Sequence, residues 1–376
     1  MSDMPFGPMF DDLMRMLSQQ GSDAWFTNAT QMAMSIARGD DGDPNAHPEL
    51  RQRLEQLAPL VSRHLAQRMG QPLTETLEAT TRSQLTQSAL VQWRPLLEPM
   101  VTLTQNLPGL GEVEGFEESA GMMAQFAHTL GPLFLGFQLG SVAGHYSERA
   151  FSLAALPLPR TDSATLVVNN IARFAEEWSL DLDQVMTFAL VEELVSALVL
   201  SQPGVGDALR FILADTVREA ARTQGDILSR LQDMSGSADA SELLAHPERL
   251  LEGLQSPEDS SATRALNAAL AALLAVGDVV ADEITGALTG PHDTLLEAWR
   301  RRRLSDARGE DAAAALFGAS LQGDHHERAE RWARHILSTH GDEALSALLR
   351  ADALPSDDEL SDPERWWNRV STSPLA

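Results

Sequence analysis

Residues 188–200, FALVEELVSALVL, constrain the fold of this chain more than any other stretch. A helix that is apolar on nearly all sides is stable only when other parts of the protein surround it. We therefore predict a central, buried helix over about residues 181–200, capped at its start by the sequence DLDQ. Glu192 and Glu193 lie in the middle of this helix and need an explanation, because carboxylates are rarely buried without partners.

Helical patterns dominate the rest of the chain. Ala, Leu, Glu and Arg fill long segments at helical spacing, aromatic residues make up 5%, and alternating runs typical of strands are scarce. We predict an all-α, multi-helix single domain over 46–376, preceded by an N-terminal arm and linker over 1–45. Further helices are expected over 50–69, 72–105, 165–179, 262–287, 294–305, 309–319 and 324–339.

The composition limits the partners and the compartment. Asp and Glu number 54 against 28 cationic residues, all of them Arg, for a formal charge of -26. Such a chain repels nucleic acid and anionic lipid, so neither is expected as a partner. The absence of Cys excludes disulfides and thiolate metal sites. Without a visible signal peptide or a run apolar enough to span a membrane, we expect a cytoplasmic protein with no membrane span.

Three glycines form a stripe in the sequence GFQLGSVAG. Gly136, Gly140 and Gly144 are four residues apart, so on a helix they share one face. Small residues on one face let another backbone approach closely, which we favour as the explanation. The alternative is a ligand groove lined by backbone.

The two central carboxylates have a structural and a catalytic interpretation. On a helix Glu192 and Glu193 lie about 100° apart, and Ser196 follows within one turn, so the three would form a small polar patch. The patch either faces solvent or pairs with an Arg of a neighbouring helix, or it holds a buried carboxylate of raised pKa for acid–base work. Composition alone favours the structural interpretation.

Several passages together resemble a bacterial family of uncharacterised zincin-like proteins, described as hydrolases or zinc-dependent metalloproteases. A sister group of that family is tied to deazaflavin coenzyme biosynthesis. The resemblance covers nearly the whole chain and depends on the order and spacing of its parts. The similar passages are MPFGPMF, GFQLGSVAGHYSERAF, LPLPR, VVNNIARFAEEWSLDLDQVMTFALVEELVSALVL, LLEAWRRRR and LPSDDELSDPERWWNRV.

The resemblance implies a degenerate zinc-binding box in the central helix. In a His-Glu-x-x-His box two imidazoles on one helix face bind zinc, and the Glu acts as general base. The matching positions here are Val191, Glu192 and Val195, and a third ligand position falls on Ala275. None of the three apolar side chains can bind a metal. The implied protein is a pseudoenzyme without a cofactor, which keeps Glu192 as a remnant general base and binds an unknown protein or peptide.

Two other functions remain open from the sequence. One is an active zinc-dependent hydrolase that uses Glu192 as general base, with zinc as cofactor and ligands from Asp278, Asp282, Glu283 or a His. The other is a structural or assembly protein. An open cleft over Glu192 would favour a binding role, whereas a cleft filled by Val191, Val195 and their neighbours would favour a scaffold.

Other candidate features have simpler interpretations. His326 and Glu330 share a face of the helix DHHERAERWARH, but its dense charge favours a solvated helix over a metal site. The resemblance places that helix away from any catalytic role. His145 is expected to be a core histidine. The run WRRRR over 299–303 is expected to pair with acidic neighbours, and the Trp pair at 366–367 to anchor the C-terminal tail.

Overall fold

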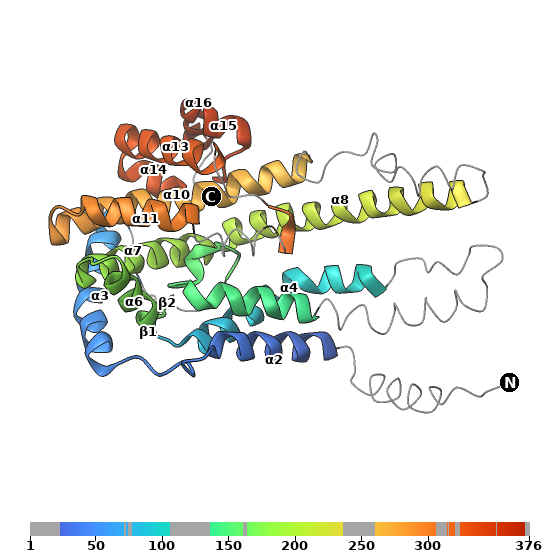
Figure 1. The fold of residues 1–376 in the computed structure, drawn as a ribbon. Coiled ribbons are helices and arrows are strands. Elements are labelled where there is room, and N and C mark those ends of the chain that lie inside the picture. The colour runs from blue at the N-terminus through green and yellow to red at the C-terminus, as the bar shows by residue number, and fades with distance from the viewer. Residues whose placement is uncertain are drawn as a thin grey trace.

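The computed structural model describes residues 23–70, 73, 77–105, 136–160, 164–235, 260–305, 314, 316–319, 324–350 and 352–372 (Figure 1). The described part is mostly helical, as predicted. Its helices are α2 (Ala24–Arg38), α3 (Pro48–Met69), α4 (Arg82–Gln105), α6 (Val168–Glu177), α7 (Leu182–Leu200), α8 (Pro203–Ser235), α10 (Ser261–Thr289), α11 (Asp293–Ser305), α13 (Asp324–His340), α14 (Asp342–Ala347), α15 (Asp357–Ser361) and α16 (Pro363–Thr372). A further helix covers 136–149, and η2 (Leu153–Ala155) is a single 3₁₀ turn.

The predicted central helix is confirmed as α7. Fifteen of its 19 residues are buried. Asp181 caps its start, and the Asp181 side chain accepts a hydrogen bond from the backbone N–H of Gln184 at 3.0 Å. α7 packs against α3, α6, α8 and α10, so the apolar surface on all sides of this helix is covered by other helices.

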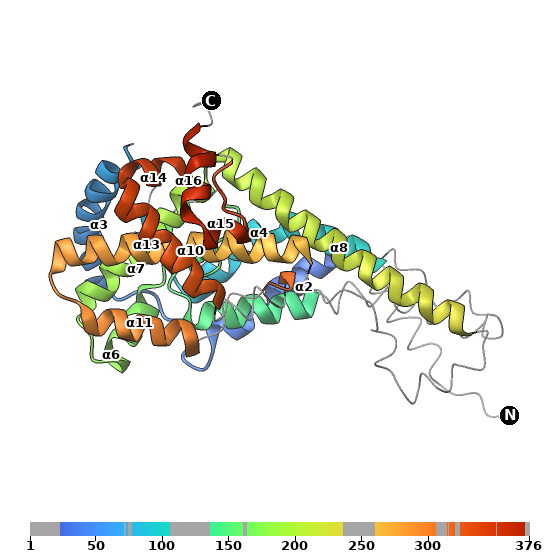
Figure 2. The same cartoon turned by 90° about the horizontal axis from the view of Figure 1, so that it is seen from above.

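Among these neighbours, α10 packs on α7 and carries the C-terminal helices on its other side (Figures 1 and 2). By length and composition α10 could cross a membrane, and 78% of its most apolar window is buried inside the protein, as in a core helix.

Two tryptophans hold the C-terminal helices together. The rings of Trp332 and Trp366 meet edge to face at 5.1 Å, and the Trp366 indole donates to the Ala353 carbonyl. The predicted tryptophan anchor of the C-terminal tail is therefore confirmed.

A second apolar cluster joins α2, α4, the helix over 136–149 and α8. The glycine stripe lies directly on α2, where an added Cβ at Gly136 or Gly140 would come within 2.5 Å of backbone oxygens of Trp25 or Ala29. Close backbone packing, the favoured explanation of the stripe, is confirmed.

Part of the segment expected to be an arm is a packed helix, because Trp25, Ala29 and Ala33 of α2 are buried. Residues 1–22 lie outside the described residues, and the domain boundary at 45/46 stays a prediction.

Two segments expected to be helical begin as short strands. β1 (Leu77–Ala79) and β2 (Ala164–Leu166) pair in parallel, with Leu77 opposite Ala164. Their backbone hydrogen bonds go to each other, so the following helices begin only at Arg82 and Val168. A pairing between segments about 85 residues apart leaves no local sequence pattern. The helix predicted over 309–319 lies mainly outside the described residues.

Candidate functional site

Glu192 lies where α7 meets α10 and α11, and its partners come from α11. The Glu192 Oε1 atom accepts a hydrogen bond from Arg303 Nη2 at 2.6 Å and another from Trp299 Nε1 at 3.1 Å. Trp299 and Arg303 are four residues apart, so they share one face of α11. Only 12% of the Glu192 side chain is exposed. The predicted pairing of this carboxylate with an Arg of a neighbouring helix is therefore observed.

The same guanidinium binds a second carboxylate, from α10. Arg303 Nη2 lies 2.6 Å and Nε 3.2 Å from Asp278 Oδ1, so Arg303 bridges Glu192 and Asp278. From α13, the His326 imidazole Nε2 lies 3.6 Å from the other Asp278 oxygen. Four helices thus meet at one cluster, which we call the Arg303 centre: Glu192, Asp278, Trp299, Arg303 and His326.

Burial and mutual charge set the protonation states in the Arg303 centre. Burial raises the pKa of Glu192 well above its usual value of 4.5, and the Asp278 carboxylate adds to this rise against the opposing charge of Arg303. Burial also acts to raise the pKa of Asp278, but Arg303 and the hydrogen bond with Glu192 outweigh it and lower that pKa. Burial and Arg303 together lower the pKa of His326. The two carboxyls beside Arg303 are therefore shifted in opposite directions, and Asp278 is the stronger acid of the pair.

This arrangement predicts how Glu192→Gln changes stability with pH. A Glu whose pKa is raised by folding contributes stability below its unfolded pKa, and that contribution is lost as pH rises through the folded pKa. We expect Glu192→Gln to match the wild type near pH 4 and to gain relative stability above it. The gain should reach at most about 1.4 kcal/mol per pH unit.

Urea unfolding at several pH values measures this difference. Glu297→Gln is the matched control, because Glu297 is an exposed glutamate of α11 whose carboxylate pairs with Arg301. A relative stability of Glu192→Gln that falls with rising pH would show that Glu192 is ionised in the folded protein.

Glu193 has a different environment from its neighbour. Its side chain is fully buried, and Arg160 Nη2 donates to Oε1 at 2.7 Å. The backbone N–H groups of Thr165 and Ala154 donate to the same carboxylate at 2.9 and 3.2 Å. Glu193 thus pairs with an Arg, as one of the two alternatives predicted, but Arg160 comes from the segment before β2 and not from a helix, and the two carboxylates do not share one patch. Adjacent positions on the helix direct the two carboxylates to different neighbours.

The three degenerate ligand positions lie within the apolar core. Val191 and Ala275 are 0% exposed and Val195 is 2% exposed. None of these side chains carries a donor atom for a metal, and the cation next to Glu192 is the Arg303 guanidinium. These residues do not fit the zinc ion that the family implies.

The substitute ligands proposed from the sequence do not gather around Glu192. Of Asp278, Asp282 and Glu283, only Asp278 belongs to the Arg303 centre. Asp282 binds His292 at 3.1 Å, and Glu283 pairs with Arg68. Within the described ranges, no group of three His, Asp or Glu side chains is placed to hold a metal ion.

Three features of the site region differ from the sequence predictions or were missed by them. The helix of His326 was expected to lie away from the central glutamate, yet α13 packs on α10 and brings His326 beside Asp278. His145, expected in the core, is exposed and lies 3.3 Å from Glu148. The run WRRRR does pair with acidic neighbours as predicted, but nothing in it singles out Trp299 or Arg303.

The comparisons with known proteins agree with this fold. The family model of zincin-like metallopeptidases matches residues 26–367, so the chain belongs to that family. No curated protein matches the chain. The fold is similar to a crystal structure from Chloroflexus aurantiacus described as a "putative hydrolase with a novel fold". The TM-score is 0.62 at 16% identity, covering 93% of this chain and 99% of the other.

Proposed function

We propose that this protein is a non-catalytic member of the zincin-like metallopeptidase family. The observation that carries the proposal is the Arg303 guanidinium, which binds Glu192 at 2.6 Å and Asp278 at 2.6 Å. A general base needs an ionised carboxylate that can reach a water molecule. Glu192 instead accepts hydrogen bonds from two donors of α11, Arg303 and Trp299, on one oxygen. In this proposal Glu192 is a structural residue.

The packing around Glu192 favours a scaffold role for this part of the protein. Val191 and Val195 fill the space at the degenerate ligand positions, and Trp299 and Arg303 cover the carboxylate. A protein or peptide partner, which the family resemblance suggested, would therefore bind away from Glu192. The active-hydrolase alternative is disfavoured for the same reason, because a substrate would have to displace Trp299 and Arg303.

The test is metal dependence of the native protein, purified without a His tag. We expect elemental mass spectrometry to find far less than one zinc per chain, even after incubation with excess zinc. Because a bound metal stabilises the folded state, we also expect a chelator to leave the Tm unchanged.

Stable zinc binding at Glu192 would contradict the proposal. Near-stoichiometric zinc that is lost in Glu192→Ala and Asp278→Ala but kept in Glu297→Ala would overturn the proposal and support an active hydrolase. Thermal unfolding of each variant verifies that loss of metal is not loss of the fold. Peptidase activity gives a second test. If the native protein cleaves a peptide library and the single change Glu192→Ala abolishes this cleavage, the proposal is contradicted whatever the zinc content.

A further inference from the structure

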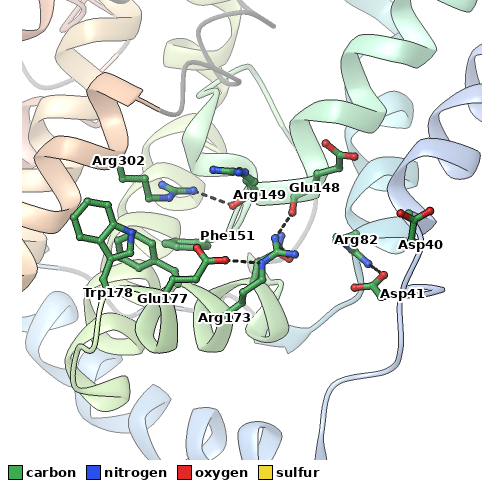
Figure 3. Close-up of a pocket in the computed structure, with 13 residues that line it drawn as sticks. Asp40, Asp41, Arg82, Glu148, Arg149, Phe151, Arg173, Glu177, Trp178 and Arg302 are labelled. Atoms are coloured by element: carbon green, nitrogen blue, oxygen red, sulfur yellow. Dashed lines mark hydrogen bonds and ion pairs between the residues drawn. The ribbon is translucent and has the colours of Figure 1, made fainter.

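A cavity of about 420 Å³ opens beside α6 and α11, and its lining includes an aromatic layer (Figure 3). Its size falls within the range of small-molecule sites. The layer is formed by Phe151 and Phe174, which contact the Trp299 ring at 5.4 and 6.0 Å between centroids. Glu192 is not among the lining residues, so this cavity is separate from the Arg303 centre.

One end of the cavity combines aromatic rings with guanidinium groups. The Arg302 guanidinium lies 3.8 Å from the centre of the Phe151 ring, which holds its plane in a stacked position. Arg302 Nη2 also donates to the Arg149 carbonyl at 2.9 Å. Trp178 is 37% exposed and lies 5.9 Å from the Phe174 ring, so a flat indole surface borders the same end.

The charged groups are unevenly placed around the cavity. In Figure 3, Asp40 and Asp41 lie at the opposite end from Trp178 and Arg302. Arg82 at that end is held by Asp41 and by Asp43. Four arginines from separate segments line the cavity in a chain of net charge -26: Arg82, Arg149, Arg173 and Arg302.

The acidic side chains on the arginine side have partners of their own. Glu148 lies 3.3 Å from His145, and Glu177 lies 3.9 Å from Arg173. The Arg173 guanidinium donates to the Glu148 carbonyl at 2.7 Å, which keeps it at the cavity wall. The end bordered by Arg302 and Trp178 lies away from Asp40 and Asp41, so a negative group is favoured there (Figure 3).

We propose that this cavity binds a small organic anion that carries a flat ring. The anionic group, a carboxylate or a phosphate, would meet the guanidinium of Arg302 and its arginine neighbours. Guanidinium N–H groups match the geometry of both anions. The ring would lie against the exposed indole of Trp178, where stacking adds to the buried apolar area. The proposal does not depend on whether Glu192 is catalytic.

The test titrates the full chain with four probes: benzoate, phenyl phosphate, inorganic phosphate and benzyl alcohol. Ligand-observed NMR or calorimetry measures the Kd of each. We expect benzoate or phenyl phosphate to bind saturably and at least tenfold more tightly than benzyl alcohol, which lacks the charge. The comparison of benzoate with phenyl phosphate tells which anion the site prefers, and inorganic phosphate measures the anion without the ring.

Two variants and a control locate the binding. Arg302→Gln should weaken the preferred ring anion at least tenfold, whereas Arg301→Gln removes the same charge from the adjacent position, 63% exposed, and should leave the Kd unchanged. Trp178→Leu alters an exposed ring and should weaken only ring-bearing probes. Thermal unfolding verifies that each variant is folded. Each of three results would overturn the proposal. No ring anion saturates the protein, benzyl alcohol binds as tightly as the ring anions, or the Kd is unchanged in both folded variants.

Discussion

Replacement of Arg303 by Met is expected to lower the free energy of unfolding by about 3–5 kcal/mol near pH 7. The guanidinium binds Glu192 and Asp278, whose side chains are 12% and 15% exposed. Its removal leaves two carboxyl groups close together in the interior with no cation between them. Urea unfolding followed by circular dichroism measures the loss.

Two controls separate this effect from a general loss of charge. Arg301→Met alters an exposed arginine on the same helix and should change the stability by less than about 0.5 kcal/mol. Adding Glu192→Gln and Asp278→Asn to Arg303→Met should recover part of the lost stability, since no unpaired carboxylate then remains. Equal effects of Arg303→Met and Arg301→Met would contradict the role assigned to the Arg303 centre.

The second large effect is expected at the neighbouring glutamate. Glu193→Gln should cost about 3–5 kcal/mol, because the buried Arg160 guanidinium loses the carboxylate that binds it at 2.7 Å. Glu193 also accepts two backbone hydrogen bonds, from Thr165 in β2 and Ala154 in η2, so the change weakens the attachment of both segments to α7. The measurement is again urea unfolding, at the same pH as for Arg303→Met.

The matched comparison is Glu192→Gln, the same chemical change one residue earlier. That variant should be at least as stable as the wild type near pH 7, since folding raises the pKa of the Glu192 carboxyl. Arg160→Met should resemble Glu193→Gln, and the double variant should cost less than the sum of the two single changes. Similar stabilities for Glu192→Gln and Glu193→Gln would show that the two carboxylates do not differ in the way described.

The sequence allowed the central helix to be predicted because its cause is local. The apolar run, the Asp181 cap and the glycine stripe each act within a few residues, and each was found where expected. The parallel pairing of β1 with β2 depends on two segments that meet only in the folded chain. No local pattern identifies such a pair, so the starts of α4 and α6 were misplaced.

The same distinction applies to the candidate site. Val191 and Val195 could be identified as unsuitable zinc ligands from residue type alone. The partners of Glu192 and Glu193 could not be identified, because Arg303 and Arg160 come from distant segments. Arg160 lies outside every segment predicted to be helical, yet it is 3% exposed and enters the core. Each of the 28 arginines was a possible partner, and only tertiary structure selects among them.

The contact between α2 and the helix over 136–149 has a consequence for how relatives of this protein should be compared. At Gly136 and Gly140 the two helices touch where this helix has no side chains. Hydrophobicity scores therefore give this helix contact little weight. A homologue could replace most apolar residues of the second cluster with others of similar volume and keep its shape. It could not place a larger residue at these two positions without moving the helices apart. Glycine spacing is therefore the better marker for aligning this region among distant family members.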